Sequence, residues 1–251
     1  MNDDMNIAKE WHAHALKIKQ DANRIILGQE KAINLVIVSL FARGHVLLEG
    51  GVGVGKTTLL QIVTKLIGGA YERVEGTVDL MPNDIIYHAS ISDEGKPSIS
   101  LGPLLKKGED LSIFFFNEIN RARPQVHSLM LRAMAEKSVS AFNKVMHLPN
   151  MVVFADRNQV EKNETFELPA AARDRFMMEV SIQSPTDKKL RDSIIFDTKF
   201  QDTSKLIDGI PSPPFDCKEL NAVSNAIQEN VQMSEHIKNY VEMLWQATES
   251  P

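Results

Sequence analysis

The sequence is poor in cysteine and in long apolar runs. Cys217 is the only cysteine, which excludes an intrachain disulfide and fits a reducing compartment. The longest apolar stretch near the start, residues 33–41, is interrupted by Asn34 and Ser39, and it is about half of the roughly 20 residues that span a bilayer. The opening residues, MNDDMN, lack the apolar segment of a signal peptide. We therefore expect a cytoplasmic protein without a membrane span.

The sequence also lacks an excess of basic charge. It has 28 basic and 33 acidic residues, for a formal net charge of −5. Proteins that bind nucleic acid through its phosphates usually have the opposite balance, so we expect no nucleic-acid partner. The chain does have 251 residues, of which 43% are hydrophobic. That is enough for a sizeable core, in one large domain or in a domain with a smaller companion.

Helices and strands alternate along the first part of the chain. Apolar residues at helical spacing predict helices over residues 7–24 and about 29–41. Residues 45–49 form a short apolar strand that opens into a glycine-rich loop, and a helix is predicted over residues 57–67.

The middle of the chain continues this alternation. Residues 111–116 and 151–155 are continuously apolar, as parallel strands covered on both faces are, and a helix is predicted between them at 124–136. Polar and apolar residues alternate around turns at 87–101 and 137–148, which predicts two hairpins. Strands that alternate with helices predict an α/β fold with a mainly parallel sheet flanked by helices.

The composition changes after residue 183. Residues 184–187, SPTD, have the pattern of a helix start, with proline at the first helical position and an acid at the third. Two more helices are predicted at about 217–230 and 234–248. We therefore expect an α/β core over residues 1–183 and a small helical domain over residues 184–251.

Residues 50–57, GGVGVGKT, match the phosphate-binding pattern G-x-x-x-x-G-K-[ST]. Glycines let backbone N–H groups converge on phosphate oxygens, and the start of the following helix favours anions. Lys56 is expected to bind the β and γ phosphates, and the hydroxyl of Thr57 to bind Mg²⁺. We therefore expect ATP to bind the following residues: Gly51, Val52, Gly53, Val54, Gly55, Lys56, Thr57 and Thr58.

The strand at residues 111–116 runs into Asn117 and Glu118. In phosphate-loop ATPases an acid at the end of a neighbouring strand helps to hold Mg²⁺, and a following glutamate can polarise the attacking water. Glu118 fits the second role. Asn117 occupies the position of the metal-binding acid, and its amide oxygen brings no negative charge. We therefore expect weaker Mg²⁺ binding and slower hydrolysis, without loss of ATP binding.

The order of these motifs resembles the MoxR branch of the AAA+ ATPases, in the clade with a hairpin inserted in the second helix. The resemblance covers almost the whole chain. It rests on ILGQEKAI (26–33), HVLLEGGVGVGKT (45–57), RVEGTVDLMPNDI (73–85), NEINRARPQVHSLMLRAM (117–134) and LPAAARDRF (168–176). Of these segments, only the phosphate loop is specific by itself. The resemblance to the family rests otherwise on the order and spacing of all five.

The resemblance implies further site residues. Ile26 and Leu27 would lie near the adenine, and Asn158 matches the polar "sensor 1" residue that orients the attacking water or contacts the γ-phosphate. Arg175 matches the arginine finger, which reaches into the neighbouring subunit's site and stabilises charge in the transition state. The hairpins at 87–101 and 137–148 would line the pore of a ring or face the substrate.

The residues alone leave other roles open at these positions. Arg175 could pair with Asp174 or Glu179 at the surface, and Asn158 could be an ordinary loop residue. Arg121 and Arg123 could lie at a subunit interface.

The chain departs from the family pattern at Asn117 and at its end. In the family, a helix with a "sensor 2" arginine follows the segment that resembles residues 234–251. We therefore expect an AAA+ nucleotide-binding core over residues 1–183 and a helical lid over residues 184–251 that lacks the sensor-2 helix.

The resemblance implies an ATPase that uses ATP and Mg²⁺ and hydrolyses ATP slowly. It also implies a homo-oligomeric ring, commonly a hexamer, that acts as a chaperone to remodel, mature or insert metal into a client enzyme, for which methanol dehydrogenase is one association. A protein with a von Willebrand factor A domain is the implied partner. Two alternatives stay open: an ATP-binding regulatory scaffold with little hydrolysis, which Asn117 favours, and a magnesium-chelatase-like ATPase subunit.

Overall fold

The computed structural model describes residues 2–91, 95–157, 166–200, 202–211, 213 and 216–249. The helices, in chain order, are α1 (Asn2–Ile25), α2 (Glu30–Phe41), α3 (Lys56–Leu66), α4 (Pro82–Ile86), α5 (Pro124–Glu136), α6 (Ala170–Arg173), α7 (Lys188–Phe196), α8 (Thr203–Asp208), α9 (Leu220–Asn230) and α10 (Glu235–Glu249). The strands are β1 (His45–Glu49), β2 (Ala70–Glu75), β3 (Tyr87–Ile91), β4 (Pro97–Leu101), β5 (Leu111–Asn117), β6 (Ser138–Ala141), β7 (Lys144–His147), β8 (Val152–Arg157) and β9 (Phe176–Ser181). Short 3₁₀ turns are η1 (Gly108–Asp110), η2 (Ile119–Arg121), η3 (Thr198–Phe200) and η4 (Cys217–Glu219).

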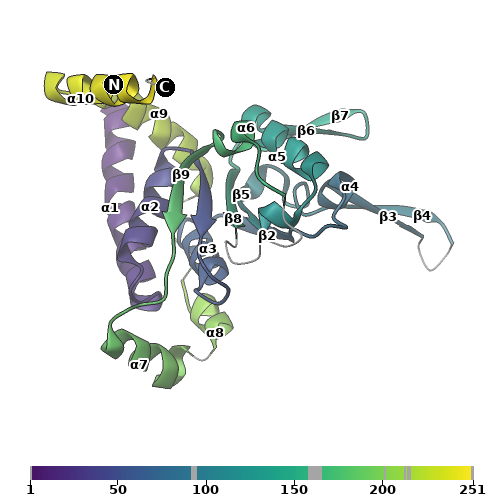
Figure 1. Cartoon of the computed structure of the whole chain (residues 1–251), viewed down its shortest axis with the longest axis horizontal. Helices are drawn as coiled ribbons and strands as arrows, with labels where there is room; N and C mark the ends of the chain where they lie inside the picture. The colour runs from purple at the N-terminus through teal and green to yellow at the C-terminus, as the bar shows by residue number, and fades with distance from the viewer. Residues whose placement is uncertain are drawn as a thin grey trace.

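A five-stranded parallel sheet forms the centre of the molecule, in the order β2-β5-β8-β1-β9 (Figure 1). This confirms the α/β fold that the alternating pattern predicts. The carboxyl ends of the strands all lie at one edge, where ligands of such sheets usually bind. Strand β8 lies between β1, which leads into the glycine loop, and β5, which ends in Asn117.

Hydrophobic clusters cover both faces of the sheet. Successive side chains of a strand point to opposite faces. Phe115 of β5 and Phe154 of β8 belong to the cluster that α1, α2 and α3 cover. Phe116 and Ala155, one residue further along each strand, belong to the cluster that α4 and α5 cover. This explains the unbroken apolar runs, since both faces of β5 and β8 are buried.

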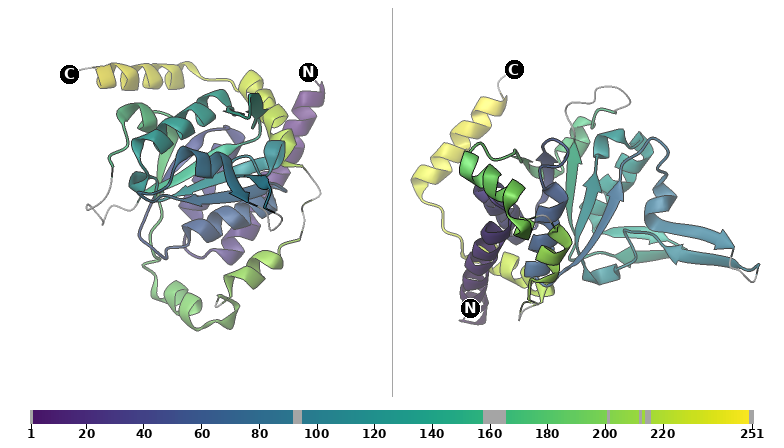
Figure 2. Two further views of the ribbon diagram at one scale, coloured as in Figure 1. Left: turned by 90° about the vertical axis from the view of Figure 1, so that its right-hand side faces the viewer. Right: turned by 90° about the horizontal axis from the view of Figure 1, so that it is seen from below.

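The two predicted hairpins are present. Strands β3 and β4 pair antiparallel, as do β6 and β7. The β3–β4 hairpin projects away from the body of the molecule (Figures 1 and 2). Ile91 and Ile99 on this hairpin are 78% and 59% exposed, so it presents apolar side chains to the surroundings.

The sequence patterns miss β2 and β9, the outer strands of the sheet. Each has one neighbour in the sheet, and Val74 and Val180 are the buried residues of these strands. The other positions are half-buried or exposed, so charged residues interrupt the apolar pattern that identifies β5 and β8.

Helix α7 begins later than the sequence pattern predicts. Asp187 is its N-cap, and the carboxylate accepts from the backbone N–H groups of Lys189 at 2.6 Å and Leu190 at 3.2 Å. The predicted helix start at 184–187 is therefore wrong by about one turn. Asp187, which the sequence pattern predicts inside the helix, is instead the cap that satisfies free N–H groups at the helix start.

Part of the segment after residue 183 packs on the core. Leu220 and Val223 of α9 belong to the same cluster as α1 and α2. Trp11 of α1 donates its indole N–H to Glu219 Oε2 at 3.0 Å. Helices α7 and α10 instead expose apolar residues such as Phe196. The division of the chain at residue 183 stays a prediction. None of the described helices is long and apolar enough to cross a membrane.

His45 at the start of β1 predicts a pH dependence of folding. Its Nδ1 accepts from the N–H of Val153 at 2.9 Å, so the ring is neutral, and burial lowers its pKa to about 4. The unfolded chain binds this proton near pH 6.5, so stability should be full above that pH and fall as the pH drops towards 4. We expect a loss of about 3 kcal/mol, measured by urea unfolding at pH 7 and at lower pH.

A His45→Gln variant removes the titrating ring. Its stability should fall less steeply over the same range, although buried His127, whose pKa is also lowered by burial, leaves a residual slope of the same sign. Equal slopes for the two proteins would show that His45 does not titrate with folding.

Candidate functional site

The loop between β1 and α3 has the geometry of a phosphate cradle. Gly53 and Gly55 have φ angles of 80° and 91°, in the left-handed region that favours glycine. A Cβ built on Gly50 would lie 2.3 Å from the carbonyl oxygen of Ile182, so the end of β9 also requires glycine there. Apart from the adjacent residues, no atom of the part of the chain that the structure describes lies within 4 Å of a Cβ built on Gly53 or Gly55, which leaves the loop open to a ligand.

Lys56 is the buried cation of the site. Its Nζ donates to the carbonyl oxygens of Gly50 at 2.6 Å and Gly51 at 3.3 Å. It also pairs with Asp156 Oδ2 at 2.6 Å, and the two side chains are 9% and 1% exposed. A phosphate that binds Lys56 must share or replace these partners.

Asp156 near the end of β8 is a site residue that the sequence analysis missed. Its carboxylate accepts from Lys56 and from the backbone N–H of Glu118. Burial raises the pKa of Asp156, and the hydrogen bonds from Lys56 and Glu118 oppose that rise. An acid near the end of an apolar strand, MVVFAD, is the signal that could have identified it.

Asn117 is the last residue of β5, and Glu118 follows it in a strained turn. Glu118 has a φ of 51°, and its carboxylate accepts from Arg121 Nη1 at 2.8 Å. The side-chain amide of Asn117 donates to Glu75 Oε1 at the end of β2. Glu75 is a second residue that the sequence analysis missed, although it lies in the RVEGTVDLMPNDI segment.

One cavity of about 280 Å³ brings most of the predicted residues together. Its lining consists of Val52, Gly53, Val54, Gly55, Lys56, Thr57, Thr58, Arg73, Asn117, Glu118 and Asp156. The loop, the strand end of β5 and the strand end of β8 thus meet at the carboxyl edge of the sheet. Arg73 and Asp156 also line this cavity, although the sequence did not predict them as site residues.

Other predicted residues lie outside this lining. Ile26 packs partly buried against the core cluster, and Leu27 beside it is half-buried. Gly51 is exposed and accepts from Lys56 through its carbonyl. The structure places none of these three in the cavity wall, and their predicted nucleotide contacts stay predictions.

Arg175 and Asn158 stay predictions as well. Arg175 is exposed in the turn between α6 and β9. Glu179, one of its possible partners, pairs with Arg157 at 2.7 Å. Asn158 lies outside the described residues.

The donor groups of the cavity suit a nucleotide with a hard divalent cation. Its hydroxyl, amide and carboxylate oxygens are ligands that Mg²⁺ prefers. The described residues contain no group of three or more His, Cys, Asp or Glu side chains that could hold a metal ion. A cation here would therefore need nucleotide phosphates as further ligands, as Mg²⁺ in phosphate-transfer sites does.

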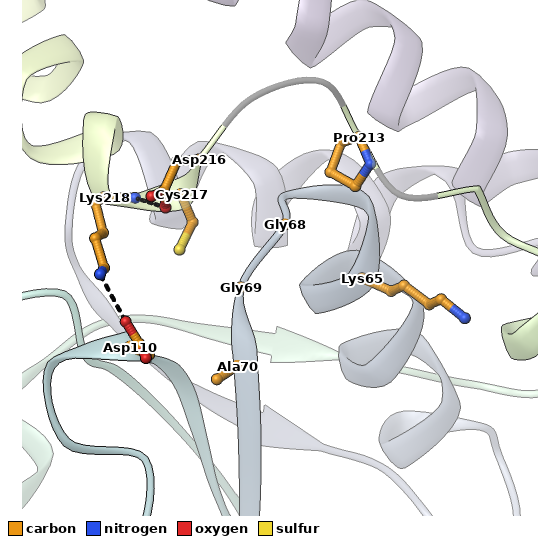
Figure 3. Close-up of a pocket in the computed structure, with 9 residues that line it drawn as sticks. All are labelled: Lys65, Gly68, Gly69, Ala70, Asp110, Pro213, Asp216, Cys217 and Lys218. Atoms are coloured by element: carbon orange, nitrogen blue, oxygen red, sulfur yellow. Dashed lines mark hydrogen bonds and ion pairs between the residues drawn. The ribbon is translucent and has the colours of Figure 1, made fainter.

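A second cavity, of about 520 Å³, lies at the opposite edge of the sheet (Figure 3). It is lined by the start of β2 and by η4, and Lys218 pairs there with Asp110 at 2.6 Å. The thiol of Cys217 lies 3.0 Å from Ser112 Oγ. Because ligands of parallel sheets bind at the carboxyl edge, this larger cavity is not the candidate nucleotide site.

The strand–loop–helix with a buried lysine, on a parallel sheet, defines a phosphate-loop nucleotide-binding protein. Residues 45–178 match the family model "ATPase family associated with various cellular activities (AAA)". The chain is 51% identical over 242 residues to Protein MoxR of Methylorubrum extorquens, covering 96% of this chain and 71% of that one. It is 48% identical over 248 residues to Protein MoxR of Paracoccus denitrificans, covering 99% and 73%. The chain belongs to the MoxR family of AAA ATPases.

Two further comparisons are more distant. Chaperone MoxR1 of Mycobacterium tuberculosis is 34% identical over 177 residues, covering 69% of this chain and 45% of that one. A crystal structure from Cytophaga hutchinsonii aligns with a TM-score of 0.79 at 24% identity, covering 98% of this chain and 72% of that one. The second similarity supports the fold alone.

Proposed function

We propose that this protein binds ATP with Mg²⁺ at the loop of residues 50–57 and hydrolyses it slowly. The observation that carries this proposal is the cavity in which Lys56, Thr57, Asn117 and Glu118 meet. Membership of an ATPase family supports the reaction. The neutral amide at Asn117 supports a low rate, since it brings no charge to the cation.

Each residue of the cavity has a distinct role in this proposal. The backbone N–H groups of the loop and Lys56 bind the phosphates, and Glu118 takes the proton of the attacking water. Mg²⁺, when bound by Thr57 and Asn117, would neutralise charge on the phosphate oxygens. Ile26 and Leu27 would contact the adenine, and Asn158 would orient the water.

We infer that the protein assembles as a homo-oligomeric ring, commonly a hexamer in this family, with Arg175 serving the neighbouring subunit. The exposed position of Arg175 supports this role. Large apolar side chains on the surface of α7 and α10 support an interface, because such patches usually mark one. They are Ile194, Ile195, Phe196, Ile237, Tyr240, Val241, Met243, Leu244 and Trp245.

We further propose that ATP turnover drives chaperone-like maturation, remodelling or metal insertion of a client enzyme, with a methanol-dehydrogenase-like client as one candidate. The similarity to Chaperone MoxR1 supports this class of function. A protein with a von Willebrand factor A domain is the partner that the family suggests. The exposed β3–β4 hairpin is a suitable contact surface for a client.

A second candidate function is an ATP-binding regulatory scaffold with little hydrolysis. The observation that favours it is the hydrogen bond from the Asn117 amide to Glu75. This bond fixes the orientation of the side chain through its nitrogen, so that Asn117 offers a cation its neutral Oδ1 alone.

The test between these functions is the Glu118→Gln variant. We expect its ATP turnover to fall about a hundredfold or more, because the amide cannot take a proton from water. ATP affinity should stay near the wild-type value, since the phosphate-binding groups are intact. Phosphate release measures the turnover, and a fluorescent ATP analogue measures the affinity.

Glu229→Gln on α9, far along the chain from the cavity-lining residues, is the control and should match the wild type. A wild-type protein that binds ATP yet turns over no faster than Glu118→Gln would favour the scaffold function over the ATPase.

A further inference from the structure

We propose that Asp156 provides the nucleotide-bound cation with the negative charge that the neutral amide of Asn117 cannot provide. This inference rests on the proposed binding of a nucleotide with Mg²⁺ at the loop. It assigns the metal-binding acid of this protein to β8 instead of the end of β5.

The strand order places Asp156 between the glycine loop that follows β1 and the end of β5. Strand β8 pairs with β1 on one side, with Leu48 opposite Asp156, and with β5 on the other, with Phe116 opposite Ala155. Asp156 is therefore level with the glycine loop and with Asn117, the residue after Phe116.

The direction of the side chains agrees with this position. Phe115 and Phe154 belong to the cluster on the α3 face of the sheet. Side chains two residues further along a strand return to the same face. Asn117 and Asp156 therefore both face α3, which begins with Lys56, and both line the cavity with Thr57.

The burial of Asp156 favours a second cation once a nucleotide binds to Lys56. Its side chain is 1% exposed and pairs with Lys56. Lys56 is the residue that phosphates would engage. A buried carboxylate that loses its cation is strongly destabilising, and a divalent cation held by the phosphates and Thr57 in the same cavity compensates the charge.

The neighbouring acids fit this role less well. Glu75 accepts from Asn117, pairs with Arg73, is 44% exposed and is not part of the cavity lining. Glu118 pairs with Arg121 at 2.8 Å. Of the acids in the cavity lining, Asp156 is the one that points to the loop lysine.

The decisive measurement is the gain in nucleotide affinity that Mg²⁺ produces, taken as the ratio of the ADP dissociation constants in EDTA and in Mg²⁺. This ratio needs no hydrolysis. We expect Asp156→Asn to lower the ratio by about tenfold to a hundredfold, the usual effect of losing a partner of a metal site. The affinity in EDTA should hold or improve, because Lys56 is released from its ion pair.

The amide variant should fold, since its oxygen can still accept from Lys56 and from the N–H of Glu118. Asp156→Ser is the second variant if it does not, with the same expected drop. Glu229→Gln on α9, outside the cavity lining, is the matched control, and its ratio should equal that of the wild type. A triple variant, Glu75→Gln/Asn117→Asp/Asp156→Asn, moves the acid from β8 to the end of β5 and should restore the ratio. Glu75→Gln is included because the carboxylate introduced at position 117 would otherwise meet that of Glu75.

The outcomes separate this inference from the proposed function. If wild type shows a Mg²⁺ gain and Asp156→Asn keeps it, Asp156 does not serve the cation and the inference fails alone. If Asp156→Asn weakens ADP binding equally in EDTA and in Mg²⁺, the inference is also overturned, because such a result indicates that Asp156 has a purely structural role. A wild-type protein that binds no ADP, or gains nothing from Mg²⁺, overturns both.

Discussion

The free energy of unfolding of the Lys56→Ala protein is expected to be about 3–5 kcal/mol lower than that of the wild type, even without nucleotide. The reason is the buried ion pair with Asp156, whose side chain is 1% exposed. Removing the ammonium leaves a carboxylate that water cannot reach, and the carbonyl of Gly50 loses its donor as well. Urea unfolding of the ligand-free protein at pH 7 measures the difference. Nucleotide affinity, measured separately at low urea, should fall in the same variant.

Two further variants isolate the cause of this loss. Lys56→Ala/Asp156→Asn should recover much of the stability, since the uncompensated charge is gone. Lys65→Ala, on the same helix α3 but 32% exposed, should change stability by about 1 kcal/mol or less. A Lys56→Ala protein as stable as the wild type would mean that the Lys56–Asp156 pair contributes nothing to folding.

The Arg175→Ala protein is expected to lose ATP turnover by about a thousandfold or more, with ATP binding unchanged. The guanidinium is proposed to act on the neighbouring subunit's nucleotide, where it stabilises charge that exists only in the transition state. Phosphate release from the assembled protein measures the loss. The exposed position of Arg175, beyond the cavity lining of its own subunit, is what this role requires.

Mixing subunits tests whether the arginine acts across the interface. An equal mixture of Arg175→Ala and Glu118→Gln subunits should regain activity, because roughly a quarter of randomly formed head-to-tail interfaces combine the two intact residues. Arg173→Ala, two residues away on α6, is the control for charge alone and should lose much less activity. A mixture as inactive as its components would count against a role in trans.

The fold was predictable where apolar residues face a covered surface on both sides. Strands β1, β5 and β8 are central, so their apolar runs are unbroken, and the predicted range for α5 agrees with the structure. Strands β2 and β9 were missed because they lie at the edges of the sheet. The start of α7 was misplaced because an acid near a proline can lie before a helix as its cap or within its first turn.

The phosphate loop, Asn117 and Glu118 were recognisable from the sequence because each depends on a run of adjacent residues. A loop of glycines followed by lysine and threonine carries its chemistry within eight positions, and an acid after an apolar strand does so within two. The contacts of Asp156 with Lys56 and of Glu75 with Asn117 were not recognisable in this way. Asp156 lies 100 residues after Lys56, and Glu75 lies 42 residues before Asn117.

These distant residues meet because the sheet does not follow the order of the chain. Strand β8 inserts between β1 and β5, which brings Asp156 against Lys56, and β2 pairs with β5, which brings Glu75 against Asn117. Strand order depends on which faces the helices bury, and no short pattern encodes it. The glycine loop and the Asn-Glu pair could therefore be identified from adjacent residues in the sequence. The position of Asp156 beside the loop lysine depends on the pairing of strands, which only the tertiary structure determines.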